Sequence, residues 1–301
     1  MLQTTIMRDV TRVLCLGAVV AGMMLMSAVP SAEAGALETF DSYAAGSQLG
    51  GQGGSGGGWA GPWSANYSPT YTEWNVTAGG LDGTANRLQF ERDAGSRLAS
   101  EFHFSRSATR PIASSPNTGA GPVYFGFYFQ HDAALAADNS TNSFLLEWRT
   151  SDFNRYLTFG IEGDEVFVET DAGTPDKQVS NADLIADGVT YQFVVKLEQD
   201  AGGAATVGGG TAEKVSIFIN PDSATEPVTA DFVYTGGASI VYNPGQTFNR
   251  VRLFGDYYGG QYASVDRLVL ADNFAAAFIP EPATAALLGL AAPLLMRRRR
   301  V

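Results

Sequence analysis

Apolar residues recur at every second position in short runs through most of the chain between residues 35 and 279, and Gly, Asn, Asp and Pro separate the runs. A period of two predicts strands that bury one face. The clearest run extends from Val123 to Gln130, where the valine and three phenylalanines share one face. Gly126 falls on the other face without a side chain, which predicts a bulge or a close approach by another backbone or a ligand.

Two alternating runs, Tyr156 to Glu162 and Glu165 to Thr170, flank the dipeptide Gly163-Asp164. Glycine at the first position of a two-residue loop suits a primed turn, so we predict a hairpin here. Alternation and flanking turn residues predict further strands. They are Leu37 to Asp41, Glu73 to Thr77, Arg87 to Glu91, Arg97 to Phe104, Asn142 to Arg149, Tyr191 to Glu198, Lys214 to Asn220, Ala230 to Tyr234, Phe248 to Gly255 and Ser264 to Ala271.

The same pattern offers almost no helix. The best candidate, Ala182 to Ala186, spans little more than one turn, and no repeat of fixed period indicates a propeller or a β-helix. About a dozen strands without helical crossovers predict an all-β fold with two packed antiparallel sheets. The length of residues 35–279 favours a single jelly-roll sandwich over two small domains.

Two glycine-rich stretches interrupt the alternation. Gly50 to Gly58 holds seven glycines in nine positions, and Ala201 to Gly210 is made mostly of Ala and Gly. This composition predicts flexible loops. Neither stretch has the features of a phosphate-binding loop.

The N-terminus has the pattern of a cleavable signal peptide. Arg8 and Arg12 precede an apolar run from Val13 to Val29, and the small residues Ala32 and Ala34 follow it at the spacing that signal peptidase recognises. We predict a signal helix in residues 1–34 with cleavage after Ala34. A permanent membrane anchor is the alternative, but the run is short and no basic stop-transfer cluster follows it.

Composition narrows the classes of partner. Residues 35–279 contain 13 Lys and Arg against 28 Asp and Glu, a net charge of −15, and the single cysteine, Cys15, lies in the predicted signal peptide. An acidic body argues against nucleic acid and anionic lipid as partners and is compatible with divalent cations. Without cysteine, the mature chain has no disulfide, no thiol nucleophile and no cysteine-ligated metal.

The C-terminus has the pattern of a second targeting signal, in addition to the predicted signal peptide. Pro280, Glu281 and Pro282 precede the uncharged run Ala283 to Met296, and four arginines follow, namely Arg297, Arg298, Arg299 and Arg300. As a helix this run is about 21 Å long, too short to cross a hydrocarbon core of about 30 Å comfortably. The arginines hold its end on the cytoplasmic side, so we predict that it stalls in the membrane during export.

This tail, residues 280–301, resembles the PEP-CTERM sorting signal. In that family a membrane-bound exosortase, a cysteine protease or transpeptidase, recognises the Pro-Glu-Pro motif. The resemblance implies that signal peptidase and exosortase are partners, that Pro280 to Pro282 form the recognition motif, and that the arginines are retention charges. It further implies delivery to the cell surface or to an exopolysaccharide matrix.

The order of strands resembles concanavalin-A-like and laminin-G-like domains, through an opening Thr39-Phe40-Asp41 and a closing pair of strands. That resemblance implies sugars as ligands and carboxylate-bound structural calcium, for which Asp41, Asp256 and Asp266 are candidates. The glucanases of this fold carry E-x-D-x-x-E on one strand, and here Glu162-Gly163-Asp164-Glu165 fails because residue 167 is Phe.

Lyases of this fold need Arg, Gln, His and Tyr on one sheet. Arg97, His103, Tyr128 and His131 supply residue types, but no motif aligns them, and both histidines fit ordinary strand positions. The sequence therefore favours a non-catalytic module that binds carbohydrate or is purely structural. A polysaccharide hydrolase or lyase on the jelly roll is the alternative.

Aromatic rings that could stack on sugars form two clusters. Trp59, Trp63 and Trp74 fall in one loop-rich stretch with Tyr67 and Tyr71, and Tyr257, Tyr258 and Tyr262 fall between the last two strands. Large aromatic side chains also cover the ends of sandwiches, so structural rings are the alternative to a glycan-binding platform.

Overall fold

A computed structural model describes most of the predicted sandwich and neither of the two terminal segments. The described residues are 34–54, 57–65, 74–91, 106–113, 122–131, 143–150, 156–171, 176–180, 183–198, 214–235, 248–256 and 262–278. The predicted signal peptide up to residue 33 and the predicted sorting tail lie outside them.

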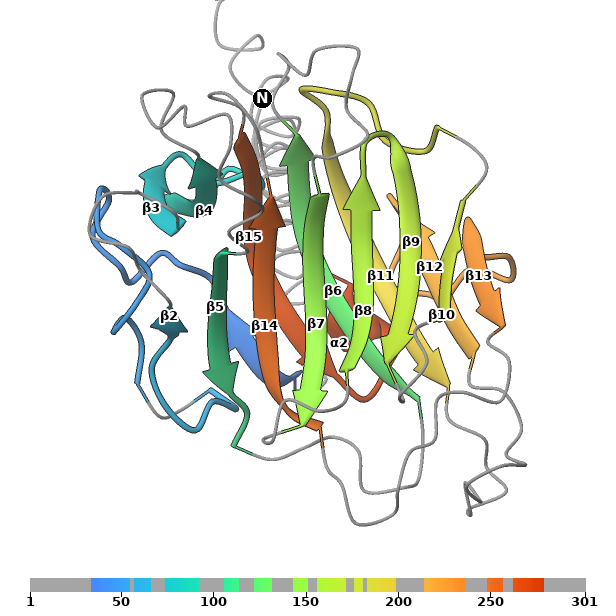
Figure 1. Cartoon of the computed structure of the whole chain (residues 1–301), viewed down its shortest axis with the longest axis horizontal. Coiled ribbons are helices and arrows are strands. Elements are labelled where there is room, and N and C mark those ends of the chain that lie inside the picture. The colour runs from blue at the N-terminus through green and yellow to red at the C-terminus, as the bar shows by residue number, and fades with distance from the viewer. Residues whose placement is uncertain are drawn as a thin grey trace, which may run out of the picture. The chain divides into compact units, whose positions relative to one another are not determined.

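The described strands form two sheets, one of eight strands and one of seven (Figure 1). The eight-stranded sheet contains β1 (Ala34–Glu38), β3 (Trp74–Ala78), β4 (Asn86–Glu91), β6 (Val123–His131), β11 (Thr190–Glu198), β12 (Lys214–Ile219), β13 (Phe232–Thr235) and β15 (Tyr262–Ala271). The seven-stranded sheet contains β2 (Ser64–Ala65), β5 (Arg106–Pro111), β7 (Ser143–Thr150), β8 (Tyr156–Glu162), β9 (Glu165–Asp171), β10 (Asp176–Val179) and β14 (Phe248–Asp256).

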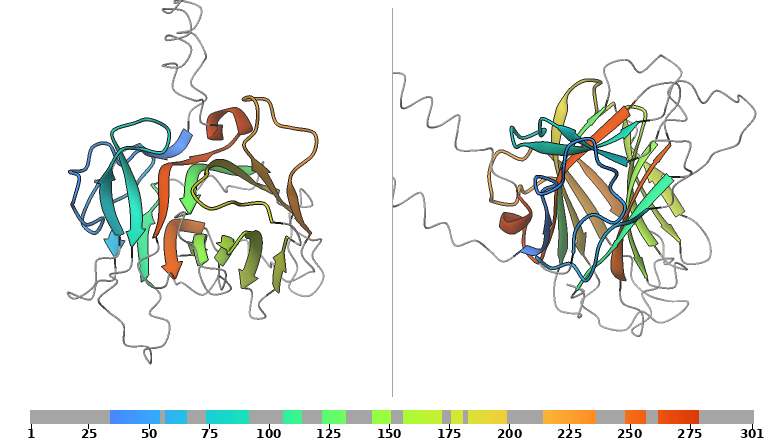
Figure 2. Two further views of the ribbon diagram at one scale, coloured as in Figure 1. Left: turned by 90° about the horizontal axis from the view of Figure 1, so that it is seen from above. Right: turned by 90° about the vertical axis from the view of Figure 1, so that its left-hand side faces the viewer.

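Every pairing between these strands is antiparallel. The first sheet has the order β13-β12-β11-β6-β15-β4-β3, with β1 beside the second half of β15, and the other has the order β10-β9-β8-β7-β14-β5-β2. The sheets lie as two layers in Figure 2. The all-β, two-sheet antiparallel sandwich predicted from alternation is therefore confirmed.

The core lies between the layers and follows the predicted alternation. Phe127 and Phe129 of β6 are fully buried and contact Phe144 of β7 across the layers, with ring centroids 6.2 and 5.0 Å apart. The predicted hairpin is also confirmed, because Glu162 pairs with Glu165 around Gly163, which has a φ of 58°. A positive φ at the first loop position is what that turn requires.

Helix α2 (Phe274–Ala277) covers the outer face of the eight-stranded sheet (Figure 2). Asn273 caps it by accepting a hydrogen bond from the amide of Ala276. A Cβ at Gly126 would lie 1.9 Å from the carbonyl oxygen of Ala277. The predicted close approach at Gly126 is thus confirmed, and the approaching group is the backbone of α2.

Some local predictions were wrong. Strands β2, β5 and β10 were missed, and the described part of the predicted helix Ala182 to Ala186 is not helical. In β5, Ser107 and Thr109 alternate with Ala108 and Arg110, so no large apolar residue marks a face. The predicted strand Arg97 to Phe104 lies outside the described residues. Within the parts of the chain that the structure describes, no helix is long and apolar enough to cross a membrane.

Candidate functional site

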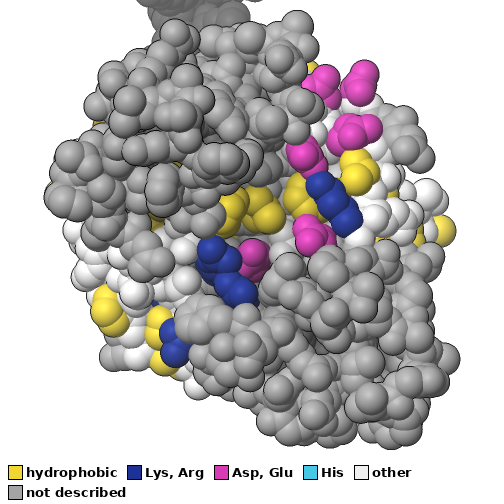
Figure 3. Space-filling model, viewed as in Figure 1, with side chains coloured by type: hydrophobic (Ala, Val, Ile, Leu, Met, Phe, Trp, Pro, Cys, Tyr) yellow, Lys and Arg dark blue, Asp and Glu magenta, His cyan; other side chains and the backbone are white. Residues whose placement is uncertain are grey.

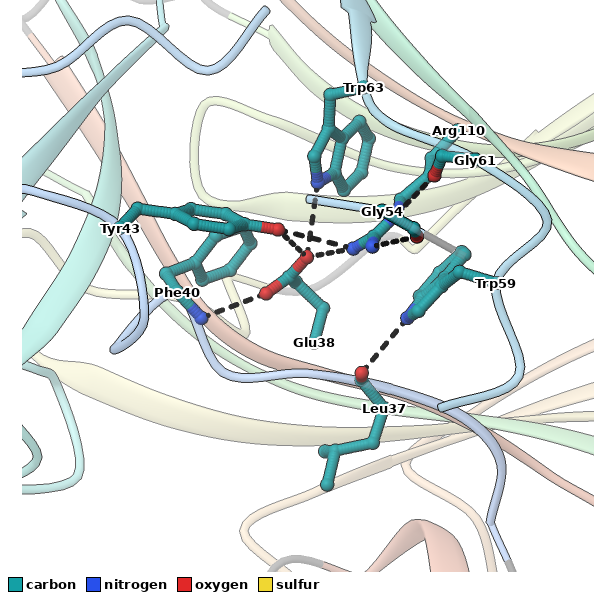
Figure 4. A network of polar contacts seen from close by, with 9 residues as sticks. All are labelled: Leu37, Glu38, Phe40, Tyr43, Gly54, Trp59, Gly61, Trp63 and Arg110. Atoms are coloured by element: carbon teal, nitrogen blue, oxygen red, sulfur yellow. Dashed lines mark hydrogen bonds and ion pairs between the residues drawn. The ribbon is translucent and has the colours of Figure 1, made fainter. Parts of the chain in front are cut away.

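The three tryptophans predicted as a glycan platform are buried. Trp59, Trp63 and Trp74 are 2%, 1% and 1% exposed. Trp59 and Trp63 enclose the guanidinium of Arg110 at 4.6 and 5.7 Å from their ring centroids (Figure 4). A ring in that position cannot stack on an external sugar, so the platform prediction is wrong for these residues and the structural alternative is correct.

Arg110 is the centre of a buried polar network that fixes the glycine-rich loop (Figure 4). It forms an ion pair with Glu38, and its Nε and Nη2 donate to the carbonyl oxygens of Gly61 and Gly54 at 3.1 and 3.2 Å. Tyr43 donates to Glu38 at 2.5 Å, and burial followed by that hydrogen bond raises the pKa of the Tyr43 phenol. Of the predicted flexible stretch Gly50 to Gly58, Gly54 is thus tied to Arg110 through its carbonyl oxygen.

Two of the three predicted calcium ligands, Asp41 and Asp266, accept hydrogen bonds from backbone amides. Asp41 Oδ1 accepts from the amides of Ala85 and Asn86, both at 3.0 Å, and Asp266 Oδ2 accepts from the amide of Leu81 at 2.9 Å. The donor amides lie between Leu81 and Asn86, and they occupy lone pairs of the carboxylate oxygens that a calcium ion would use. The side chain of Asp256 lies outside the described residues, among which no group of three acidic, His or Cys side chains could hold a metal.

Asp266 lies on the outer face of the eight-stranded sheet and is fully buried beneath that loop. Burial, and then the neighbouring carboxylate of Asp82, raise the pKa of Asp266 to about 7. Arg267 follows it with a φ of 47°, at the irregularity where the pairing of β15 with β6 shifts register. The carboxylate therefore organises a loop, and it faces away from the seven-stranded sheet.

Of the residues considered for catalysis, the structure describes His131 and Tyr128. His131 is 1% exposed, and burial lowers its pKa to about 4. Tyr128 packs on the outer face of the eight-stranded sheet with Val194 and Val269. Arg97, His103, Tyr67 and Tyr71 lie outside the described residues. The structure therefore brings no lyase-like set together within the part that it describes.

The outer face of the seven-stranded sheet carries a continuous line of polar side chains that sequence reasoning missed. On six of the strands core residues alternate with these positions, and on β10 Lys177 pairs with Glu169, so the side chains share the face that points away from the core. We call this line the polar row. Across the sheet from β10 to β2 it comprises Lys177, Glu169, Thr158, Glu147, Arg252, Thr109 and Ser64.

The polar row crosses seven strands, which corresponds to about 29 Å at about 4.8 Å per strand. The residues of the polar row are far apart in the sequence, on separate strands between Ser64 and Arg252, so no local pattern marks them as a group. Figure 3 shows this face, where charged side chains of both signs gather with apolar side chains between them. Only the cross-strand register reveals that they form a line.

Glu147 is the centre of the polar row and is 5% exposed. Both of its carboxylate oxygens lie near Arg252 Nη1, at 3.3 and 3.0 Å, and Arg149 Nη1 lies 3.4 Å from Oε2. The Arg252 guanidinium also lies 5.1 Å from the ring centroid of Phe254. The carboxylate is therefore held in position by cations from two adjacent strands.

Thr158 occupies the next position of the polar row and is fully buried. Its Oγ1 finds no hydrogen-bond partner in the part of the chain that the structure describes. A buried hydroxyl without a partner costs about 1–3 kcal/mol, so native structures rarely retain one without a reason. Here the hydroxyl lies between Glu147 and Glu169 on the outer side of the sheet.

A line of mainly apolar residues runs beside the polar row. It comprises Val179, Phe167, Gly160, Leu145 and Phe254. The ring of Phe167 lies over Gly160, where a Cβ would come within 2.1 Å of it, and Lys177 Nζ lies 4.1 Å from the ring centroid. Phe167 is 2% exposed, so the accessible apolar side chains of this line are the partly exposed Leu145 and Phe254. Apolar side chains beside a line of charges are suited to a ligand that has both apolar and polar faces.

Several predicted site residues cannot be placed. Tyr257, Tyr258, Ala32, Pro280, Glu281, Pro282 and the arginines Arg297 to Arg300 lie outside the described residues. Ala34 is the first residue of β1, and its backbone pairs with Ala271. The predictions of signal cleavage and sorting stay predictions.

No protein-family model matches the sequence, and no curated protein is similar to it. Among solved structures, the endo-1,3-β-glucanase from Streptomyces sioyaensis is 14% identical at a TM-score of 0.48, covering 78% of this chain and 94% of that one. Alginate lyase vAL-1 from Chlorella virus is 10% identical at a TM-score of 0.46, covering 72% of this chain and 94% of that one.

The receptor-binding domain of botulinum neurotoxin type G is 9% identical at a TM-score of 0.42. The match covers 76% of this chain and 48% of that one, so the chain spans about half the length of that structure. Similarity at this level does not assign the chain to a family or to an activity.

Proposed function

We propose that this protein is an exported, non-catalytic sandwich of the concanavalin-A-like kind that binds a polysaccharide along the polar row. The observation that carries the proposal is Thr158, whose fully buried hydroxyl has no partner among the described residues although it adjoins Glu147 and Glu169. A sugar hydroxyl can donate to and accept from such a group. Phe254, which is partly exposed at the other end of the apolar line, would receive the C–H face of the same ring.

Two features favour binding over hydrolysis. Glu147 and Glu169 lie two strands apart, about 9.6 Å at the usual spacing of strands, whereas retaining glycosidases place their carboxyl groups about 5 to 5.5 Å apart. Among the described residues, Asp266 is a carboxyl group whose pKa is raised into the range of a general acid, and it belongs to the other sheet.

The test is a binding measurement paired with a turnover measurement on the same polysaccharides. We expect retention on at least one polymer in affinity electrophoresis, lost in Thr158→Val and kept in Thr158→Ser, without release of reducing ends or unsaturated uronates. Product formation that Glu147→Gln abolishes would establish the enzyme alternative. Absence of retention on every polymer would leave a purely structural module.

We also propose that signal peptidase and an exosortase-type enzyme process the chain on its way to the cell surface or an exopolysaccharide matrix. The support is the order of elements in the sequence, a cleavable apolar N-terminus and a Pro-Glu-Pro, apolar and arginine-rich C-terminus. Intact-mass and C-terminal peptide analysis of protein from native cells tests this. A mature product that still carries residues 283–301 would contradict exosortase processing.

A further inference from the structure

The predicted sorting tail is attached near the middle of one face of the sandwich. Ala277, in α2, lies over Gly126, which is close to the middle of β6, the central strand of the eight-stranded sheet. Phe278 follows and packs on the apolar cluster of the same outer face. The chain continues from Phe278 into the tail, so the tail starts from the centre of this face.

The link between the sandwich and the predicted membrane segment is short. Residues 279–282 alone separate Phe278 from Ala283, the first residue of that segment. Five steps of fully extended chain span at most about 18 Å. From β6 the nearest edge of the sheet is β1, two strands or about 10 Å away, and the other sheet lies about 10 Å behind. The link is therefore too short to bring the face that carries the polar row against the membrane.

Exposed apolar side chains gather on the side where the tail is attached. Among the described residues, large hydrophobic side chains are exposed at four positions, and three of these, Leu37, Val228 and Val233, lie on this side. Leu37 and Val233 alternate with core residues of β1 and β13, so their side chains point outward. Leu37 pairs with Val269, which pairs with Gly126 beneath α2. Exposed apolar side chains on one side are suited to contact with a membrane.

The loop between β12 and β13 is held over the same face. Glu226 accepts hydrogen bonds from the hydroxyl of Tyr124 at 2.8 Å and from Lys196 Nζ at 2.7 Å, and these two residues pair between β6 and β11. Figure 2 shows the loop and α2 on the same side of the sandwich. Val228 follows Glu226 by two residues and is fully exposed. The loop therefore presents this valine on the side where the tail is attached.

We propose that, while the tail anchors the chain, the outer face of the eight-stranded sheet lies against the lipid bilayer and the polar row points away from it. This inference rests on the proposed sorting tail and goes beyond it, because it states which face meets the membrane. Asp222, Asp231 and Asp272 are exposed on this side, so the contact suits zwitterionic rather than anionic headgroups. The polar row would then be open to a polysaccharide before the tail is cleaved.

Single labels can test the orientation, because residues 35–301 contain no cysteine. Residues 35–301 are reconstituted into phosphatidylcholine vesicles, with a fluorophore on one introduced cysteine and a nitroxide quencher on part of the lipid headgroups. We expect strong loss of fluorescence for labels on Leu37→Cys and Val228→Cys. The matched control is Ser64→Cys, an exposed position of the polar row, where we expect little or no loss.

Each other outcome contradicts the proposal in a distinct way. Equal quenching at Ser64→Cys and Val228→Cys, or stronger quenching at Ser64→Cys, would overturn the orientation and leave the membrane anchor intact. So would absence of quenching at all three positions in protein that floats with the vesicles, because this face would then stand away from the lipid. Protein that does not float with the vesicles would overturn both the orientation and the predicted membrane segment.

Discussion

Single buried polar groups distinguish the two faces of this sandwich. Thr158 on the seven-stranded sheet is fully buried and leaves its hydroxyl without a partner among the described residues. Asp266 on the eight-stranded sheet is equally buried, yet both of its oxygens accept hydrogen bonds from Leu81, Thr84 and Arg267. The first arrangement is suited to a ligand and the second to holding a loop.

Replacement of the unpartnered hydroxyl should separate stability from binding. We expect Thr158→Val to raise the free energy of unfolding by about 1 kcal/mol, because a methyl group of similar shape replaces a buried polar group that has no partner. Polysaccharide affinity should fall in the same variant. Urea denaturation and affinity electrophoresis measure the two quantities. A less stable Thr158→Val protein would show that the hydroxyl has a structural partner.

Asp266 should make stability depend on pH. Its pKa of about 7 in the folded state exceeds the ordinary value of 3.8, so the folded state binds the proton more tightly. The contribution is therefore fully present below about pH 4 and is lost as the pH rises to about 7, with a slope of at most about 1.4 kcal/mol per pH unit. Asp266→Asn should abolish this component, so the variant should gain stability relative to the parent between pH 4 and pH 7.

Urea denaturation across that pH range measures the difference. Asp222→Asn, in an exposed position, is the control for a lost negative charge. Parallel curves for the parent and Asp266→Asn would show that Asp266 does not titrate in this window.

At the scale of elements, packing depends on a few close approaches. Gly126 of β6 admits the carbonyl oxygen of Ala277, and Gly255 of β14 admits the ring of Phe90 from the facing sheet, where a Cβ would lie 2.7 Å away. Phe274 then packs edge-on against Tyr124 and Phe218 at 6.1 and 5.3 Å. Helix α2 is thus held on the sheet by a backbone contact at Ala277 and by ring contacts at Phe274.

A methyl group at Gly126 should dislodge α2. A Cβ there would lie 1.9 Å from Ala277 O, so Gly126→Ala forces the helix away from the sheet at a cost of about 1–3 kcal/mol. Urea denaturation measures the cost, and proteolysis next to Phe274 should become faster. Gly54→Ala is the control, because a Cβ at Gly54 meets nothing within 4 Å. Equal stability of the two variants would contradict the close contact.

Alternation predicted the elements well where one face is strongly apolar. Strands β6, β8 and β9 were predicted almost to the residue, since Phe, Val and Ile alternate there with polar residues. Strand β5 was missed because Arg110 takes an inward position that the pattern reserves for apolar residues. The site was missed for a related reason, since Glu147 and Thr158 become neighbours only through the pairing of β7 with β8.

The aromatic cluster shows the limit of composition as a guide to a site. Trp59 and Trp63 are close in sequence and looked available for a ligand, but their rings enclose a cation that arrives from β5. Nothing local in the sequence pairs Arg110 with Glu38, which lies 72 residues away. Because Trp59 and Trp63 pack around the buried guanidinium of Arg110, their rings are not available to a ligand.

At the scale of the whole molecule, the first and last strands of the described chain are joined. Leu37 pairs with Val269 and Glu38 with Leu268, so β1 completes the eight-stranded sheet beside β15. The same strand supplies Glu38, the carboxylate partner of Arg110 in the β5 strand of the other sheet. Signal cleavage after Ala34 would leave both contributions in place, because Gly35 to Glu38 stay with the mature chain.

The two roles of β1 predict how far the N-terminus can be shortened before the protein loses stability. A chain that begins at Gly35 should unfold at the same urea concentration as longer versions. A chain that begins at Thr39 loses β1 and leaves Arg110, which is 4% exposed, as a buried charge without Glu38. Breaking a buried ion pair costs about 3–5 kcal/mol, a large part of the 5–15 kcal/mol by which domains are stable.

The point variant Glu38→Gln separates the loss of the carboxylate from the loss of β1, since it removes the negative charge and keeps the strand. We expect it to lose about 3 kcal/mol or more, and the chain from Thr39 to lose more still or to fail to fold. Urea midpoints followed by tryptophan fluorescence report directly on this region, because Trp59 and Trp63 lie against Arg110. Equal midpoints for the chains from Gly35 and Thr39 would show that β1 and its glutamate are dispensable, and the join between the two ends of the sandwich would then contribute nothing to its stability.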